Sequence, residues 1–108
     1  MNRDHSLLLM VLSSIEDIKK YTKGMDIGNF CDDSKTYDAC CMKLQLIWEI
    51  IDEKIQEEAT RSNITNIKGI CRLRDKISHH YMGLDDQIVW DTIQESLPIL
   101  EADVRSIL

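Results

Sequence analysis

Two of the three histidines in this chain lie in one short stretch, beside an arginine and a tyrosine. The stretch reads Arg74-Asp75-Lys76-Ile77-Ser78-His79-His80-Tyr81. An arginine guanidinium binds phosphate oxygens through a fork of donors, and an imidazole exchanges protons near neutral pH. Residues of these types at this short spacing can carry out acid–base chemistry on a phosphate ester.

If this stretch is helical, its geometry divides the side chains into two pairs. Each residue of a helix turns by about 100°, so Arg74 and Tyr81, seven residues apart, point in nearly the same direction. Asp75 and His79 are four residues apart and share a face, so Asp75 can fix the tautomer of His79 and raise its basicity. The side chains of Arg74 and His79 point about 140° apart around the axis of a regular helix. A loosening of the helix near Gly83 would reduce this angle.

Such a set can cleave RNA without a metal ion. His79 would remove the proton of a 2′-hydroxyl, and Arg74 would stabilise the charge on the pentacoordinate phosphorus while the 5′-oxygen leaves with a proton. The products would be a 2′,3′-cyclic phosphate and a 5′-hydroxyl. One histidine cannot easily act on both sides of an in-line displacement, whereas two copies across a dimer interface can. On spacing alone a structural role is the more common one, because cations favour a helix C-terminus.

Helical periodicity predicts the elements around this stretch. The first helix is expected over Arg3 to Thr22, with Asp4 or Ser6 as its cap and Gly24 as its end. Its apolar positions recur at helical spacing and are Leu8, Val11, Leu12, Ile15, Ile18 and Thr22. This pattern indicates an amphipathic core helix.

The connector that follows is expected to hold a short helical turn after Asp26, with Phe30 closing one end of the core. The next helix is expected to begin near Ser34, which can serve as its cap. It has the longest uninterrupted apolar pattern of the chain, made of Tyr37, Cys40, Cys41, Leu44, Ile47, Trp48, Ile51 and Ile55. We expect it to be the spine of a helical bundle.

Two more helices complete the prediction. One runs from about Ile67 to His80 and carries the Arg–His stretch. The last begins at Asp85 or Asp86, and its core face consists of Ile88, Val89, Ile93, Leu97, Leu100, Val104 and Ile107. Pro98 falls inside this pattern, so a kink is expected there. No period-two alternation occurs, and the predicted fold is a single all-α domain over residues 1–108 with four to five helices.

Composition limits the possible functions. The net charge of −6 argues against an extended non-specific nucleic-acid surface, although a local basic site around Arg72, Arg74 and Lys76 is compatible with it. An acidic chain can equally be one half of a complex with a basic partner. The longest early apolar run, Leu7 to Leu12, is too short to span a membrane, and no signal peptide is visible, so a cytoplasmic protein is expected.

No metal or cofactor is expected. The four cysteines form no CxxC pair and are expected to be buried, reduced thiols: Cys31, Cys40, Cys41 and Cys71. Three carboxylates, Glu49, Asp52 and Glu53, resemble a metal site but fall on the polar face of their helix. Trp48 and Trp90 are expected in the core or an interface rather than as platforms for stacking bases.

The motif formed by Arg74, four residues, His79, one residue and Tyr81 resembles the signature of the HepT-like proteins of the HEPN superfamily. The similarity covers nearly the whole chain and is most specific in its last third. It includes Tyr21-Thr22, Phe30, Thr36-Tyr37-Asp38-Ala39, Met82-Gly83-Leu84-Asp85, Ile88-Val89-Trp90 and Leu97-Pro98-Ile99-Leu100.

This resemblance implies a HEPN-like helical bundle that forms a homodimer, with paired Arg–His motifs facing a cleft at the interface. It implies the ribonuclease toxin of a type VII-like toxin–antitoxin system, whose partner is a nucleotidyltransferase of the MntA type. In family members this antitoxin transfers AMP from ATP to the motif tyrosine, which is Tyr81 here. Adenylates beside Arg74 and His79 would block an RNA phosphate by charge and bulk.

Two positions depart from the family pattern. Family members commonly carry Gly-Glu on the third helix, where this chain has Trp48-Glu49, and a tryptophan near Ile67, a few residues before the motif arginine. The expected function is an endoribonuclease with Arg74, His79 and Asp75 as catalytic residues and Tyr81 as the AMPylation site. The alternative is a non-catalytic helical subunit that binds a nucleotidyltransferase, which the acidic charge favours.

Overall fold

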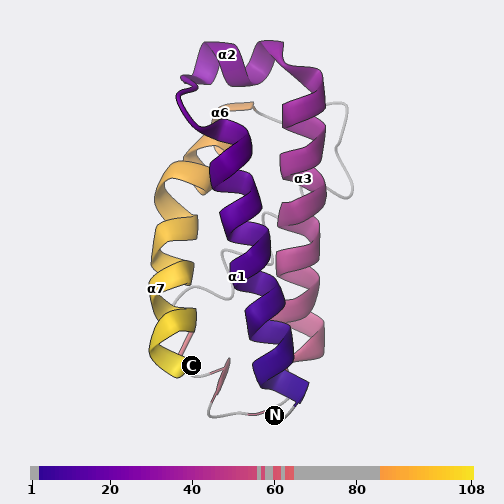
Figure 1. The fold of residues 1–108 in the computed structure, drawn as a ribbon, viewed down its shortest axis with the longest axis vertical. Coiled ribbons are helices and arrows are strands. Elements are labelled where there is room, and N and C mark those ends of the chain that lie inside the picture. The colour runs from indigo at the N-terminus through magenta and orange to yellow at the C-terminus, as the bar shows by residue number, and fades with distance from the viewer. Residues whose placement is uncertain (1–2, 56, 58–59, 62, 65–85) are drawn as a thin grey trace.

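A computed structural model of the chain describes residues 3–55, 57, 60–61, 63–64 and 86–108. All regular structure in these residues is helical: α1 (Arg3–Thr22), α2 (Ile27–Asp32), α3 (Ser34–Glu49), η1 (Ile50–Lys54), α6 (Asp86–Asp91), η3 (Thr92–Ser96) and α7 (Leu97–Ile107). Figure 1 shows α1 in front of and between α7 and α3, with α2 across one end of the bundle and both chain termini at the other end. The predicted all-α fold class is confirmed.

Helix α1 has the predicted bounds, and its inner face packs against α3 and α7. Leu8, Val11, Ile15 and Ile18 are buried, as their helical spacing predicts. Gly24 adopts a φ of +77°, which a residue without a Cβ tolerates, and so the helix ends there as expected.

The predicted cap of α1 is wrong. Asp4 and Ser6 both lie inside the helix, which begins at Arg3. The Asp4 carboxylate instead accepts a hydrogen bond from the backbone N–H of Glu57, at 3.0 Å. Asp4 therefore ties the first turn of α1 to the chain that follows η1, and a partner 53 residues away in sequence cannot be read from local spacing.

Two aspartates cap the next helices. Asp26 accepts from the backbone N–H of Asn29 at 2.8 Å and starts α2, as predicted. Asp33, one residue before the predicted Ser34, caps α3 by accepting from the backbone N–H of Thr36 at 3.1 Å and from its hydroxyl at 2.8 Å. These hydrogen bonds to the carboxylate hold the pKa of Asp33 below its usual range.

Helix α3 and the π-helical turn η1 form the spine of the described bundle. The predicted apolar set from Cys40 to Ile55 is buried, and Tyr37 is half-buried at its start. Trp48 is only 1% exposed, so it fills the core and does not serve as an external platform for bases. The packing role expected for Trp48 is thereby confirmed.

The last helix passes through a π turn on its way to Pro98. The backbone N–H of Leu97 bonds the carbonyl of Thr92, five residues back, and Pro98 then occupies the first turn of α7. A proline there lacks an N–H and would clash with the carbonyl four residues earlier. The wider π turn η3 lies just before Pro98 and accommodates the proline. This is the position where a kink was predicted.

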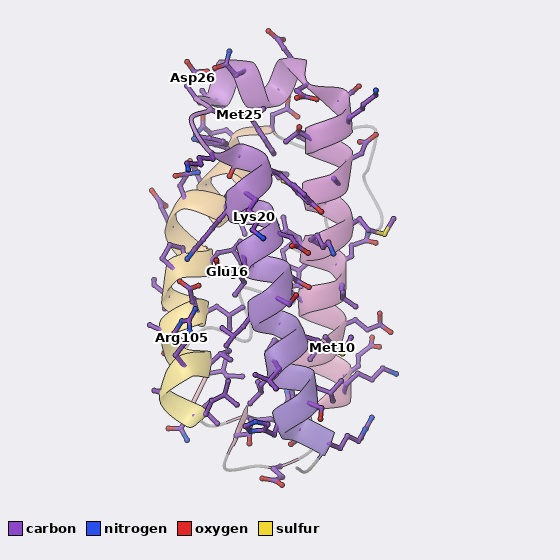
Figure 2. All side chains as sticks on the ribbon, viewed as in Figure 1. Met10, Glu16, Lys20, Met25, Asp26 and Arg105 are labelled. Atoms are coloured by element: carbon purple, nitrogen blue, oxygen red, sulfur yellow. The ribbon has the colours of Figure 1, made fainter. Side chains whose placement is uncertain are left out.

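A cluster of charged side chains joins α1 to α7 on the outside of the bundle. The Lys19 ammonium contacts the Glu101 carboxylate at 2.7 Å, and Arg105 contacts Glu101 at 3.5 Å and Glu16 at 3.6 Å. Figure 2 shows Glu16 on α1 and Arg105 on α7 along the same flank of the molecule. Bonding to Lys19 holds the pKa of Glu101 below its ordinary value.

Candidate functional site

The predicted site residues Arg74, Asp75, His79 and Tyr81 lie outside the described residues, as does the predicted helix from Ile67 to His80. Their assignment therefore stays a prediction from the sequence. The structure describes the chain on both sides of the motif. The N-terminal flank is the described chain up to Ile64, and the C-terminal flank begins at Asp86. These flanks show how the bundle holds the chain where it enters and leaves that segment.

On the N-terminal flank, Arg61 holds the chain against the end of η1. Its Nη1 donates to the carbonyl oxygens of Ile51 at 3.0 Å, Asp52 at 3.1 Å and Ile55 at 3.4 Å. The last carbonyls of a helix have no intrahelical donors, and a cation also suits the negative end of the helix dipole. Ile64, three residues later, is buried in the core. The chain is thus fixed immediately before residue 65.

On the C-terminal flank, Asp86 begins α6 and interacts with side chains of two other helices. Burial is the main cause that raises the pKa of the Cys31 thiol of α2, and the Asp86 carboxylate raises it further. Burial, together with this carboxylate, raises the pKa of Tyr37 far above its usual value, so its hydroxyl stays protonated and remains a donor. The negative charge of Asp86 also suits the first turn of a helix.

Aromatic packing supports this flank from inside the bundle. Phe30 of α2 is fully buried, and its ring centroid lies 5.2 Å from the ring of Tyr37 and 5.2 Å from that of Trp90. Both pairs are tilted, at 42° and 45°, a geometry in the favourable range for aromatic rings. Phe30 closes this end of the core, as predicted, and joins α2, α3 and α6.

The thiols of α3 are placed for packing rather than for nucleophilic chemistry. Burial is the main cause that raises the pKa of Cys40 to about 12 and that of Cys41 to about 11. A thiol is nucleophilic only as the thiolate, and almost none is present at neutral pH with such values. Buried, reduced thiols were predicted for these positions. Cys71 lies outside the described residues.

A small cavity lies at the opposite end of the bundle from Phe30, near the chain termini. Its volume is about 140 Å³, and it is lined by Asp4, His5, Leu8, Glu57, Thr60, Ile107 and Leu108. In the part of the chain that the structure describes, no group of His, Cys, Asp and Glu could hold a metal ion, and no helix is long and apolar enough to cross a membrane.

Comparison with known proteins shows the family of this chain. The model of the family described as ribonuclease HepT-like matches residues 11–107, which include α1 from Val11 onward, both flanks and the Arg–His motif. The chain belongs to the HepT-like ribonuclease family. The resemblance to this family is thereby confirmed, and with it the all-α, HEPN-like helical fold.

Several HepT-like relatives are similar over most of their length. The chain is 30% identical over 103 residues to the probable ribonuclease HepT of Thermococcus cleftensis, covering 94% of this chain and 93% of the relative. It is 31% identical over 93 residues to a candidate RNase of Methanocaldococcus jannaschii, covering 86% and 77%. A candidate RNase of Caldanaerobacter subterraneus subsp. tengcongensis is 30% identical over 98 residues, covering 91% and 88%. No solved structure matches.

Sequence reasoning missed the contacts that hold the flanks. The sequence analysis gave Arg61 no role, and it assigned Tyr37 and Trp90 to the core separately. No local signal brings the rings of Phe30, Tyr37 and Trp90 together, because helical periodicity describes one helix at a time. The burial of each ring was predictable, but their meeting depends on how three helices pack.

Proposed function

We propose that this HepT-like chain is a metal-independent endoribonuclease and the toxin of a type VII-like toxin–antitoxin pair. The observation that carries the proposal is the intact motif of Arg74, His79 and Tyr81 in a chain that belongs to a ribonuclease family. The relatives named above as ribonucleases, one of them as HepT, support the same activity. RNA is the substrate in this proposal, and the site of action is the cytoplasm.

In the proposed mechanism, His79 takes the proton of the ribose 2′-hydroxyl and the 2′-oxygen attacks phosphorus. Asp75, four residues before His79, orients its imidazole, and Arg74 binds the non-bridging oxygens on which negative charge grows. The bond from phosphorus to the 5′-oxygen breaks, and that oxygen takes a proton from the second His79 of a homodimer. The products are a 2′,3′-cyclic phosphate and a 5′-hydroxyl end.

Control of the toxin in this proposal acts on Tyr81. An MntA-type nucleotidyltransferase would transfer AMP from ATP to the Tyr81 hydroxyl and release pyrophosphate. Seven residues separate Tyr81 from Arg74, so on a helix the adenylate would lie on the face that binds the RNA phosphate. Its charge and bulk would exclude RNA.

The acidic charge favours one other function, a helical subunit that binds a nucleotidyltransferase and does no chemistry itself. Purified protein incubated with RNA in EDTA separates the two. The ribonuclease proposal predicts fragments with 2′,3′-cyclic phosphate ends, whereas uncut RNA, together with harmless expression in cells lacking the antitoxin, favours the subunit.

The AMPylation step has its own test. Incubation with the neighbouring nucleotidyltransferase and ATP should add mass in steps of one AMP and should abolish RNA cleavage. Tyr81→Phe should take up no AMP at that position and should stay active in the presence of the antitoxin. Undiminished labelling of Tyr81→Phe would place the modification on another residue.

A further inference from the structure

The cavity near the chain termini has a lining whose chemistry indicates a ligand. Three parts of the chain form this lining: the start of α1, the chain that follows η1, and the end of α7. Figure 1 shows the start of α1 and the end of α7 at the same end of the bundle. The cavity volume of about 140 Å³ is several times the roughly 30 Å³ that a water molecule occupies in the liquid, so a ligand of about five non-hydrogen atoms fits.

The described lining carries negative charge. Asp4 and Glu57 each contribute a carboxylate and His5 contributes an imidazole, while the described lining contains neither lysine nor arginine. Two carboxylates outweigh one imidazole whether or not His5 is protonated. A charge that is removed from water also attracts an opposite charge more strongly, and Asp4 is only 6% exposed. The lining therefore favours a cation over a neutral molecule or an anion.

Two buried residues of the lining can accept hydrogen bonds from such a cation. The Asp4 carboxylate accepts from the backbone N–H of Glu57 at 3.0 Å, and a carboxylate has about four acceptor positions. Thr60 is 6% exposed, no described residue hydrogen-bonds its hydroxyl, and this oxygen is not sealed in the core. Buried hydroxyls are normally hydrogen-bonded, so the Thr60 hydroxyl indicates a donor that occupies the cavity.

The rest of the lining is apolar and suits a hydrocarbon chain. It consists of Leu8, Ile107 and Leu108. In the part of the chain that the structure describes, no group of His, Cys, Asp and Glu is placed to hold a metal ion, which leaves an organic cation. Glu57 and Leu108 are exposed, so the cavity has an opening to solvent through which a ligand can enter.

We propose that this cavity binds a primary alkylammonium group, which donates hydrogen bonds to Asp4, Glu57 and Thr60 and packs its alkyl chain against Leu8 and Ile107. Such a group is carried by free alkylamines and by the lysine side chain, whose four carbons and ammonium nitrogen match the size of the cavity. The inference does not rest on the ribonuclease proposal, because every residue that carries it belongs to the described bundle.

The experiment titrates purified full-length protein with n-butylammonium chloride at neutral pH and follows the side-chain methyl groups by NMR. We expect saturable shifts of the Leu8 and Ile107 methyls with a Kd on the order of 1 mM, a strength reasonable for so small a ligand. The methyls of Ile99, which is exposed on α7 outside the lining, should not move. n-Butanol and butyrate have similar size without the positive charge and should bind at least about tenfold more weakly.

Two variants test the polar contacts. Thr60→Val keeps the shape of the side chain and removes its hydroxyl, and it should weaken butylammonium binding about fivefold, the equivalent of one hydrogen bond. Glu57→Gln removes a charge at an exposed position, so the fold is retained, and it should also weaken binding about fivefold. Glu95→Gln neutralises an exposed carboxylate of η3 outside the lining and should leave the Kd unchanged.

A peptide probe separates the two sources of the ammonium group. The probe is Nα-acetyl-glycyl-lysyl-glycine amide, and its control carries an acetylated lysine, which has no charge. Binding of the probe within about fivefold of n-butylammonium, with no binding of the control, assigns the cavity to a lysine side chain of a protein partner. Binding of n-butylammonium and 1,4-diaminobutane without binding of the peptide assigns it to a free amine.

Three outcomes overturn the inference. The first is the absence of saturable shifts of the lining methyls with n-butylammonium. The second is equal binding of n-butanol or butyrate, which would show that charge plays no part. The third is an unchanged Kd in both Thr60→Val and Glu57→Gln, which would place the ligand elsewhere. Whether the protein cleaves RNA does not affect any of these results.

Discussion

Arg61→Ala tests how the bundle holds the chain just before the motif. Nη1 of Arg61 carries two protons and donates to three carbonyls at the end of η1, with the two shortest contacts at 3.0 and 3.1 Å. A hydrogen bond from a charged donor contributes about 1.5–3 kcal/mol. Because Arg61 is half-buried, values at the low end apply, and we expect its loss to cost about 2 kcal/mol of unfolding free energy.

A second arginine supplies the matched control. Arg105 contacts Glu16 and Glu101 at 3.6 and 3.5 Å, but its side chain is 58% exposed. Exposed ion pairs contribute about 0–1 kcal/mol, so Arg105→Ala should cost less than half as much as Arg61→Ala. Arg61→Lys keeps the charge but offers a single flexible ammonium, and it should recover only part of the loss.

The assay is urea unfolding followed by far-UV circular dichroism. Protein concentration is held equal for all variants, because dimerisation would couple stability to concentration. With an m-value of about 1–2 kcal/mol/M for a chain of this size, Arg61→Ala should lower the midpoint by about 1 M or more. An Arg61→Ala midpoint equal to or above that of Arg105→Ala would refute the reasoning, since the contact with the η1 carbonyls would then contribute nothing.

Three further predictions concern the described bundle. Hydrogen bonding to Lys19 lowers the pKa of Glu101, so this pair stabilises the fold at neutral pH. Glu101→Gln should cost at most about 1 kcal/mol at pH 7, and the difference from wild type should vanish as the pH falls through the lowered pKa of Glu101. In a variant whose other cysteines are replaced by serine, the buried thiols of Cys40 and Cys41 should react slowly with a disulfide reagent at pH 8. Their rate of reaction should equal the rate of the local or global unfolding that exposes them. Trp48→Gly should cost about 3–5 kcal/mol in a thermal or urea melt because the side chain is buried; an unchanged melt would contradict this.

Local signals predicted the described helices well. The stripe from Leu8 to Ile18 and the positive φ of Gly24 fix α1 without help from other elements, and the buried set of α3 follows the same logic. The cap of α3 was misplaced by one residue because Asp33 and Ser34 are both good capping types, and the carboxylate satisfies both the N–H and the hydroxyl of Thr36.

Contacts between distant segments were beyond the sequence. The Asp4 carboxylate bonds the backbone N–H of Glu57, and the ring of Phe30 packs against that of Trp90, in each case across more than fifty residues of chain. For the candidate site, the spacing of Arg74, His79 and Tyr81 indicated the chemistry, and the family comparison supports ribonuclease activity at the level of the family. The roles of the individual residues rest on the motif, because none of them is among the described residues.

The most direct test of the central claim compares two adjacent histidines in one RNA-cleavage assay. Wild type, His79→Ala and His80→Ala are incubated with a defined RNA in EDTA, and the initial rates and end groups are measured. We predict that His79→Ala loses a factor of about 10²–10⁴, that His80→Ala stays within a few fold of wild type, and that the wild-type products carry 2′,3′-cyclic phosphates. Cleavage by His79→Ala at the wild-type rate, or loss of wild-type cleavage in EDTA, would contradict the metal-independent Arg–His mechanism.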